Sequence, residues 1–200
     1  MRNHLQFHWW KYAIVILLPI ILWTSIFSSL KAPAPEQRVH ILYVGQSLDT
    51  ERLQNQLTAA LPELTTQQLK AVTVTTADTT PLSYDTLDVR CFDYDILLFE
   101  ESSMPENVGQ AVFVRLTEAL LAQLPDTRVY QEDVAEAGVL TYGFVISPNA
   151  QTRLSDCYRG NQNCYLFISP RSVNFDTLNE NGRAGNDAGL KAAQFLLEKP

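Results

Sequence analysis

VHILYVGQS at residues 39–47 and DILLFEE at residues 95–101 decide the fold of this chain. Both open with a short, nearly continuous apolar run, which is typical of a strand buried on both faces of a parallel sheet. After the first run, apolar residues recur at helical spacing from Leu53 to Leu61, and Pro62 is expected to end that helix. A strand followed by an amphipathic helix indicates an alternating α/β chain.

The rest of the chain continues this alternation. Runs rich in β-branched and aromatic residues predict three more strands, at residues 72–74, 139–146 and 164–168. Ser103 and Glu106 are expected to form the capping box of a second helix that ends at Pro125, residues 126–138 to be irregular, and Leu190 to lie on a last helix. The predicted fold class is α/β, a layered sheet of mainly parallel strands with flanking helices.

Four residues are candidates for ligand binding because each follows a predicted strand. Gln46 and Ser47 lie in the turn after the first run, and Glu100 and Glu101 follow the second. Open α/β sheets bind ligands beyond the carboxyl ends of their strands. A glycine at such a turn also has a purely steric explanation, and acidic residues there are often simply solvated or begin a helix. Side chains of adjacent residues leave a strand in opposite directions, so a catalytic pair is not predicted.

No catalytic, metal or cofactor site is predicted from the sequence. The histidines are His4, His8 and His40, and His40 falls inside the first strand run, where a core or edge position is expected. The cysteine and histidine spacing matches no zinc pattern. The D-x-D pattern of Asp93 and Asp95 precedes a strand instead of following it, so it is interpreted as the entrance to that strand.

A membrane anchor is predicted near the N-terminus. The chain carries no charged residue from Tyr12 to Leu30, and a helix of that length would span roughly 28 Å, close to the thickness of the bilayer core. The alternative is a cleaved signal peptide. The predicted organisation is a cytoplasmic tail at 1–11, a transmembrane helix at 12–30, a Pro-rich spacer at 31–38 and an extracytoplasmic α/β domain at 39–200.

Charge indicates where the domain resides and what it does not bind. Residues 1–31 carry a formal charge of +3. Because the whole chain has a formal charge of −7, the remaining residues carry −10. A short basic N-terminus usually stays in the cytoplasm, so the predicted location is a single-pass protein of the cell membrane with its domain outside. An acidic domain repels phosphate backbones, and nucleic acid is therefore not expected as a partner.

The chain has three cysteines, and two of them enclose a short polar loop. In an oxidising compartment Cys157 and Cys164 could form a disulfide bond across that loop. The alternative is a pair of unpaired thiols that pack as small apolar groups. Cys91 is expected to be buried and inert.

The runs at residues 39–44 and 94–99 resemble the first lobe of the extracellular solute-binding proteins that serve carbohydrate ABC transporters. That family binds its solute between two lobes, and this chain has room for only one. The resemblance implies a truncated, membrane-anchored relative that works beside a sugar transporter. The leading hypothesis is therefore a non-enzymatic interaction or accessory domain, possible partners being transporter or other membrane proteins. The alternatives are an anchored enzyme acting on cell-wall or sugar substrates and a scaffold or sensor of the cell envelope.

Overall fold

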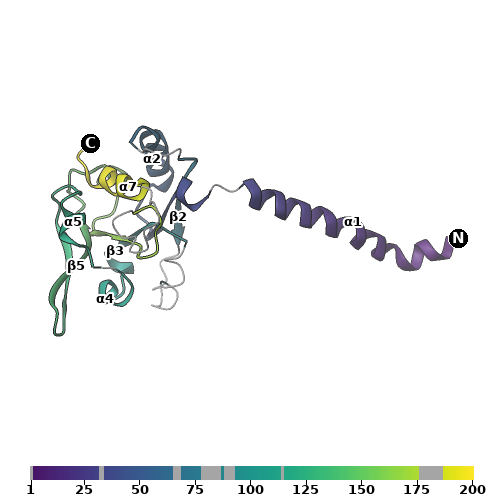
Figure 1. The fold of residues 1–200 in the computed structure, drawn as a ribbon, viewed down its shortest axis with the longest axis horizontal. Helices are drawn as coiled ribbons and strands as arrows, with labels where there is room; N and C mark the ends of the chain where they lie inside the picture. Colours follow the sequence, from purple (N-terminus) through teal and green to yellow (C-terminus); the bar gives the residue numbers. More distant parts are fainter. Residues whose placement is uncertain are drawn as a thin grey trace. The chain divides into compact units, whose positions relative to one another are not determined.

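The computed structural model describes residues 2–31, 34–64, 69–77, 87, 93–113, 115–175 and 187–200. The chain forms two compact units, Met1–Ala34 and Pro35–Pro200. The first unit contains a single long helix, α1 (Arg2–Lys31), which has Pro19 inside it (Figure 1). Within the described part of the chain, no helix combines the length and the apolarity that crossing a membrane requires.

The second unit is built on one six-stranded sheet. Its spatial order is β2 (Ala71–Ala77), β1 (Arg38–Val44), β3 (Ile96–Glu100), β6 (Cys164–Ile168), β5 (Gly138–Ile146) and β4 (Val129–Val134). β1 runs parallel to both β2 and β3, which confirms the parallel pairing predicted for the first three strands.

The other half of the sheet corrects the expectation of mainly parallel strands. β6 is antiparallel to β3, β5 is antiparallel to β6, and β4 is antiparallel to β5. Parallel neighbours need a crossover of a dozen or more residues, whereas β4 and β5 are joined by a short turn at residues 135–137 and can pair only as a hairpin. The fold is therefore α/β with a mixed sheet.

Both faces of the sheet are covered, which explains why β1 and β3 show no polar alternation. Alternate residues of each strand point to opposite faces. One face carries a core that includes Val39, Ile41, Ile96, Leu98 and Leu166. The other face carries a second core that includes Leu42, Val44, Leu97, Phe99 and Phe167.

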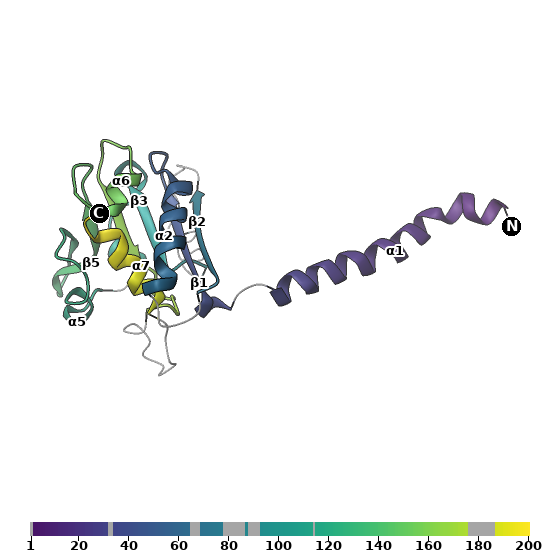
Figure 2. The same ribbon diagram turned by 90° about the horizontal axis from the view of Figure 1, so that it is seen from above.

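Helices form the outer layers of the domain. The first core is covered by α2 (Thr50–Leu64), α6 (Arg153–Cys157) and α7 (Ala188–Leu197) (Figure 2). α2 buries Leu53 and Leu61, as their spacing predicted, and Asp49 caps it by accepting a bond from the Arg52 N–H at 3.1 Å. Pro62 lies inside the last turn, so the helix ends two residues later than predicted.

The helix predicted from Ser103 to Pro125 is wrong. The structure has three short elements there, namely η2 (Glu101–Ser103), α4 (Val108–Val112) and α5 (Glu118–Leu121). Asn107 has a left-handed φ of 50° and precedes α4 without a side-chain cap, so the expected capping box does not begin this helix. Phe113 is extended and stacks on Phe167, with ring centroids 4.5 Å apart. Phe113 therefore belongs to the core on the second face directly after the end of α4.

The acidic segment predicted to be irregular, residues 126–138, contains the edge strand β4. Glu132 in this strand is buried and accepts hydrogen bonds from the backbone N–H groups of Gly109 and Gln110, each at 2.8 Å. The carboxylate therefore satisfies the first amides of α4 from a distant part of the chain. Glu132 is the one acidic residue of this segment that makes such a contact, whereas Asp126, Asp133 and Glu136 are exposed. One further short element, η1 (Pro35–Gln37), precedes β1.

Candidate functional site

Three of the four predicted binding residues meet at one edge of the sheet. β1 and β3 are parallel neighbours with Val44 opposite Phe99, so their carboxyl ends lie side by side. The chain leaves β1 for α2 on one face and leaves β3 for α4 on the other, which is the arrangement that opens a crevice in α/β sheets. Gln46 and Ser47 follow β1 at this point, and Glu100 ends β3.

The carboxylate of Glu100 is the centre of this edge. The residue is only 7% exposed. Its Oε1 accepts hydrogen bonds from the Ser47 hydroxyl at 2.7 Å and the Tyr158 hydroxyl at 3.2 Å. Its Oε2 accepts from the Gln46 N–H at 3.0 Å and from the Tyr43 hydroxyl at 3.4 Å. Each oxygen therefore has two donors, all supplied by the protein itself.

These contacts determine the protonation of the cluster. Burial by itself would raise the pKa of Glu100, but the hydrogen bonds, led by those from Ser47 and Gln46, outweigh it and hold the pKa below its ordinary value. Burial raises the pKa of Tyr43 and Tyr158, and the charge of the carboxylate adds to the rise. At neutral pH the cluster therefore consists of an ionised carboxylate and protonated phenols.

Glu101 does not join this cluster. Its Oε2 accepts from the backbone N–H and the side-chain amide of Asn163, both at 3.2 Å, and its Oε1 accepts from the Tyr165 hydroxyl at 3.3 Å. Tyr165 belongs to the second core, whereas Tyr43 and Tyr158, the two tyrosine partners of Glu100, belong to the first. The two carboxylates thus diverge, as expected for adjacent residues of a strand.

Gly45 is required by close packing around the carboxylate. A Cβ atom on this residue would lie 2.4 Å from the hydroxyl oxygen of Tyr43 and 2.7 Å from Oε2 of Glu100. The same hydroxyl accepts a hydrogen bond from the Ser47 N–H at 2.9 Å, which fixes the turn. The steric explanation for this glycine is therefore sufficient.

A segment from a distant part of the chain covers the crevice. Leu48 forms an isolated antiparallel bridge with Tyr158, and the Arg159 N–H donates to the Ser47 carbonyl at 2.8 Å. The Arg159 guanidinium forms an ion pair with Asp49 at 3.0 Å. A cavity of about 200 Å³ remains at the surface, lined by Gln46, Ser47, Leu48, Asp49 and Arg159. Sequence reasoning missed Tyr158, because no local pattern connects it with β3.

Cys157 and Cys164 are free thiols, so the predicted disulfide bond is absent and the alternative of two buried, unpaired cysteines describes the structure. Cys157 ends α6 and its Sγ contacts Oε1 of Gln56 at 3.4 Å, while Cys164 begins β6 opposite Glu100. The two side chains thus pack into the same core from different elements, α6 and β6. Burial raises both thiol pKa values, that of Cys164 to about 12. Cys91 lies outside the described residues.

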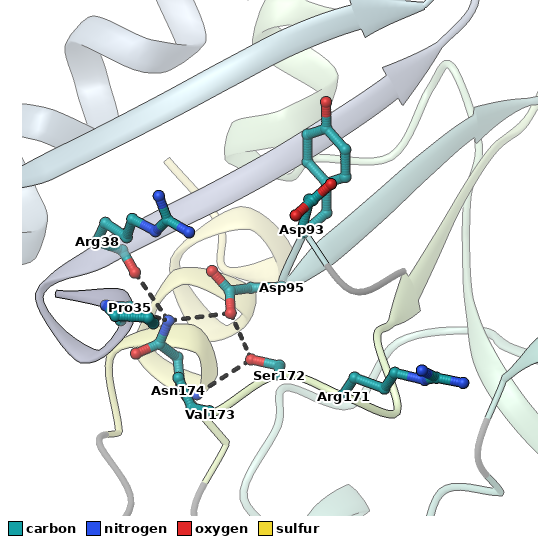
Figure 3. Close-up of a pocket in the computed structure, with 9 residues that line it drawn as sticks. Pro35, Arg38, Asp93, Asp95, Arg171, Ser172, Val173 and Asn174 are labelled. Atoms are coloured by element: carbon teal, nitrogen blue, oxygen red, sulfur yellow. Dashed lines mark hydrogen bonds between the residues drawn. The ribbon is translucent and has the colours of Figure 1, made fainter. Parts of the chain in front are cut away.

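A second polar cluster lies at the amino end of β3 (Figure 3). Asp95 immediately precedes the strand, which agrees with its interpretation as a strand entrance. Its Oδ1 accepts hydrogen bonds from the Ser172 hydroxyl and, at 2.9 Å, from the side-chain amide of Asn174. Its Oδ2 accepts a hydrogen bond from the backbone N–H of His40 at 2.8 Å. Burial raises the pKa of Asp95, and these hydrogen bonds oppose that rise without cancelling it. His40 itself is half-buried on β1.

Glu100 and Asp95 are buried carboxylates that both already accept hydrogen bonds from the protein. In the part of the chain that the structure describes, no group of three or more His, Cys, Asp or Glu side chains is placed to hold a metal ion. No family model, no curated protein and no solved structure matches this chain.

Proposed function

We propose that this chain is a membrane-anchored extracytoplasmic domain that binds a partner without catalysing a reaction. The observation that carries the proposal is that protein groups already fill the hydrogen-bonding positions of the Glu100 carboxylate. This carboxylate occupies the position at which α/β sheets place ligands, yet both of its oxygens accept hydrogen bonds from the protein. A general acid or base needs a proton or lone pair within reach of its substrate. Glu100 instead holds the turn after β1 in one conformation.

The surface that Glu100 supports has the properties of a binding edge. Gln46 is exposed, and the Asp49–Arg159 ion pair lies beside it, with the Arg159 side chain 76% exposed. A rigid turn presents these groups without the entropic cost of ordering a loop on binding. Such an edge suits a polar partner that can exchange hydrogen bonds with an amide, a carboxylate and a guanidinium. The resemblance noted above makes a carbohydrate transporter in the same membrane the proposed partner.

The anchor is proposed from the first unit. The uncharged run from Tyr12 to Leu30 lies on the continuous helix α1. Its described large apolar side chains are exposed, including Val15 at 69% and Ile21 at 62%. Apolar side chains exposed around a whole helix favour a lipid environment over water. A separate experiment tests the anchor: protease added to intact cells should remove the domain and leave a short membrane fragment. Full-length protein that survives this treatment would overturn the proposed location.

Site-specific photo-crosslinking tests the binding edge. A photoreactive amino acid at Gln46 should crosslink the intact protein to a membrane partner in native membranes, and the same probe at exposed Gln131 on β4 provides the matched control. Equal labelling from both positions, or from neither, would contradict the proposal. Turnover of a glycan or peptidoglycan fragment that the change Glu100→Gln abolishes would favour the anchored-enzyme alternative instead.

A further inference from the structure

We propose that β2 is an interaction surface for a second copy of this chain, and that the two β2 strands pair antiparallel across a two-fold axis. β2 is one of the two outer strands of the sheet, and β4 is the other (Figure 2). An edge strand presents backbone N–H and C=O groups with which another chain can pair. The proposal uses neither Gln46 nor Glu100 and goes beyond the function proposed above.

A side chain of α2 shows which residues of β2 face outwards. Oε1 of Gln54 accepts a hydrogen bond from the Val74 N–H at 3.0 Å. This N–H therefore points away from β1, and Thr76, two residues further on, faces outwards as well because backbone groups alternate along a strand. Within the described part of the chain, the Thr76 N–H has no hydrogen-bond partner. The edge is accessible here, since Thr75 and Thr76 are both exposed.

The two edges of the sheet differ in their protection against pairing. Charged side chains and β-bulges are common ways of protecting an edge strand. β4 has both, because it carries Glu132 and Asp133 and its register shifts between Tyr130 and Gln131. The β2 sequence AVTVTTA contains no charged residue and no proline, and its seven residues stay in register with β1. β2 is therefore the edge that is open to another strand.

The accessible half of β2 is complementary to itself. When Thr75 lies on the two-fold axis, Val74 of each copy is opposite Thr76 of the other, and Thr73 is opposite Ala77. The Thr76 N–H then donates to the Val74 carbonyl of the other copy, and symmetry repeats the bond. Every pair joins uncharged residues, and β-branched pairs of this kind stabilise antiparallel strands.

Charge favours this edge as the place where two copies meet. Residues 32–200 carry a formal charge of −10, so two copies repel each other over most of their surfaces. The uncharged strand is where that repulsion is least. Pairing over residues 73–77 buries much less than the roughly 1,200–2,000 Å² of a stable interface. We therefore expect a reversible dimer with a dissociation constant of about 1–100 μM.

Cysteine cross-linking of the full chain in detergent micelles tests the register. Thr75→Cys, made together with Cys91→Ser, places a thiol on the two-fold axis, where the two Cα atoms of a non-hydrogen-bonded pair are about 4.5 Å apart and can be bridged. Mild oxidation should give a covalent dimer. Exposed Lys70 lies five residues from the axis in each copy, which separates the two Lys70 positions by about 33 Å. Lys70→Cys and Gln131→Cys on β4 should therefore cross-link at least about tenfold more slowly.

Sedimentation equilibrium of the full chain measures the affinity without a cross-link. Thr75→Lys places two like charges face to face and should weaken dimerisation at least about tenfold, whereas Gln131→Lys on the other edge should leave it unchanged. Melting temperatures identify any variant that fails to fold, and the cysteine series decides the matter if Thr75→Lys does. A monomeric wild-type chain at about 500 μM, equal cross-linking from all three cysteines, or unchanged affinity in folded Thr75→Lys would overturn the proposal.

Discussion

Replacing Glu100 with glutamine tests how the carboxyl edge of the sheet is held together. The substitution preserves volume but removes the charge and turns one acceptor oxygen into an NH₂ donor. Of the four groups that donate to Glu100, only the Gln46 N–H must donate. The other three are hydroxyls, of Ser47, Tyr43 and Tyr158, and each can rotate to accept instead. The glutamine can therefore stay paired, with its oxygen towards the backbone amide.

The expected loss is the difference between charged and neutral hydrogen bonds. A bond to a charged group contributes about 1.5–3 kcal/mol and a neutral one about 0.5–1.5 kcal/mol. Three bonds to Glu100 are well formed, at 2.7, 3.0 and 3.2 Å. Removing the buried charge also removes its desolvation cost, so we expect Glu100→Gln to lower the free energy of unfolding by about 1–2 kcal/mol. Glu100→Leu leaves the Gln46 N–H without an acceptor, and this unsatisfied donor should cost about 1–3 kcal/mol more than Glu100→Gln does.

Urea unfolding followed by far-UV circular dichroism measures this difference in the full chain in detergent. The pKa of Glu100 is lowered by folding, so its stabilising contribution is complete above the ordinary carboxyl pKa of about 4.3 and is lost as pH falls through the folded value. The gap between wild type and Glu100→Gln should thus be constant from about pH 8 to 5 and close below about pH 4. A gap that is absent at neutral pH, or that widens on acidification, would refute this reasoning.

Three other outcomes are expected. Asp95→Asn should lower the free energy of unfolding by about 1–3 kcal/mol, more than Glu100→Gln in the same urea assay, because Asp95 faces two groups that must donate, a backbone N–H and a side-chain amide; a smaller loss would contradict this. Gly45→Ala should cost about 1–3 kcal/mol because its Cβ would overlap the Glu100 cluster, and unchanged thermal stability would argue against the packing. Mass spectrometry of denatured, unreduced protein should find Cys157 and Cys164 both alkylated, whereas protection of the pair would demonstrate a bridge.

The parts of the fold that were predicted correctly depend on short-range patterns. The apolar runs at residues 39–44 and 96–99 became neighbouring parallel strands, because residues buried on both faces must be apolar at every position. The spacing from Leu53 to Leu61 predicted the buried face of α2 for the same reason. In these segments the side chains that determine the structure are neighbours in sequence.

The half of the sheet that was mispredicted depends on contacts between distant residues. Nothing local distinguishes an antiparallel β6 from a parallel one, since its five residues are buried in either direction. Residues 103–125 have a helical pattern, but Phe113 reaches the aromatic cluster of the second core and ends α4 early. The acidic residue Glu132 is buried only because two amides of α4 lie within reach of it.

The candidate sites divide in the same way. Sequence alone determined that Gln46, Ser47 and Glu100 follow strands, and parallel pairing then brings them to one edge. Only the tertiary structure decided what Glu100 does there, because its donor Tyr158 lies 58 residues away and reaches it through the segment that covers the crevice. Likewise, Asn174 donates to Asp95 only because folding brings its amide next to a residue 79 positions away in the sequence. Hydrogen-bond satisfaction depends on every group within about 3 Å, and sequence distance does not encode it.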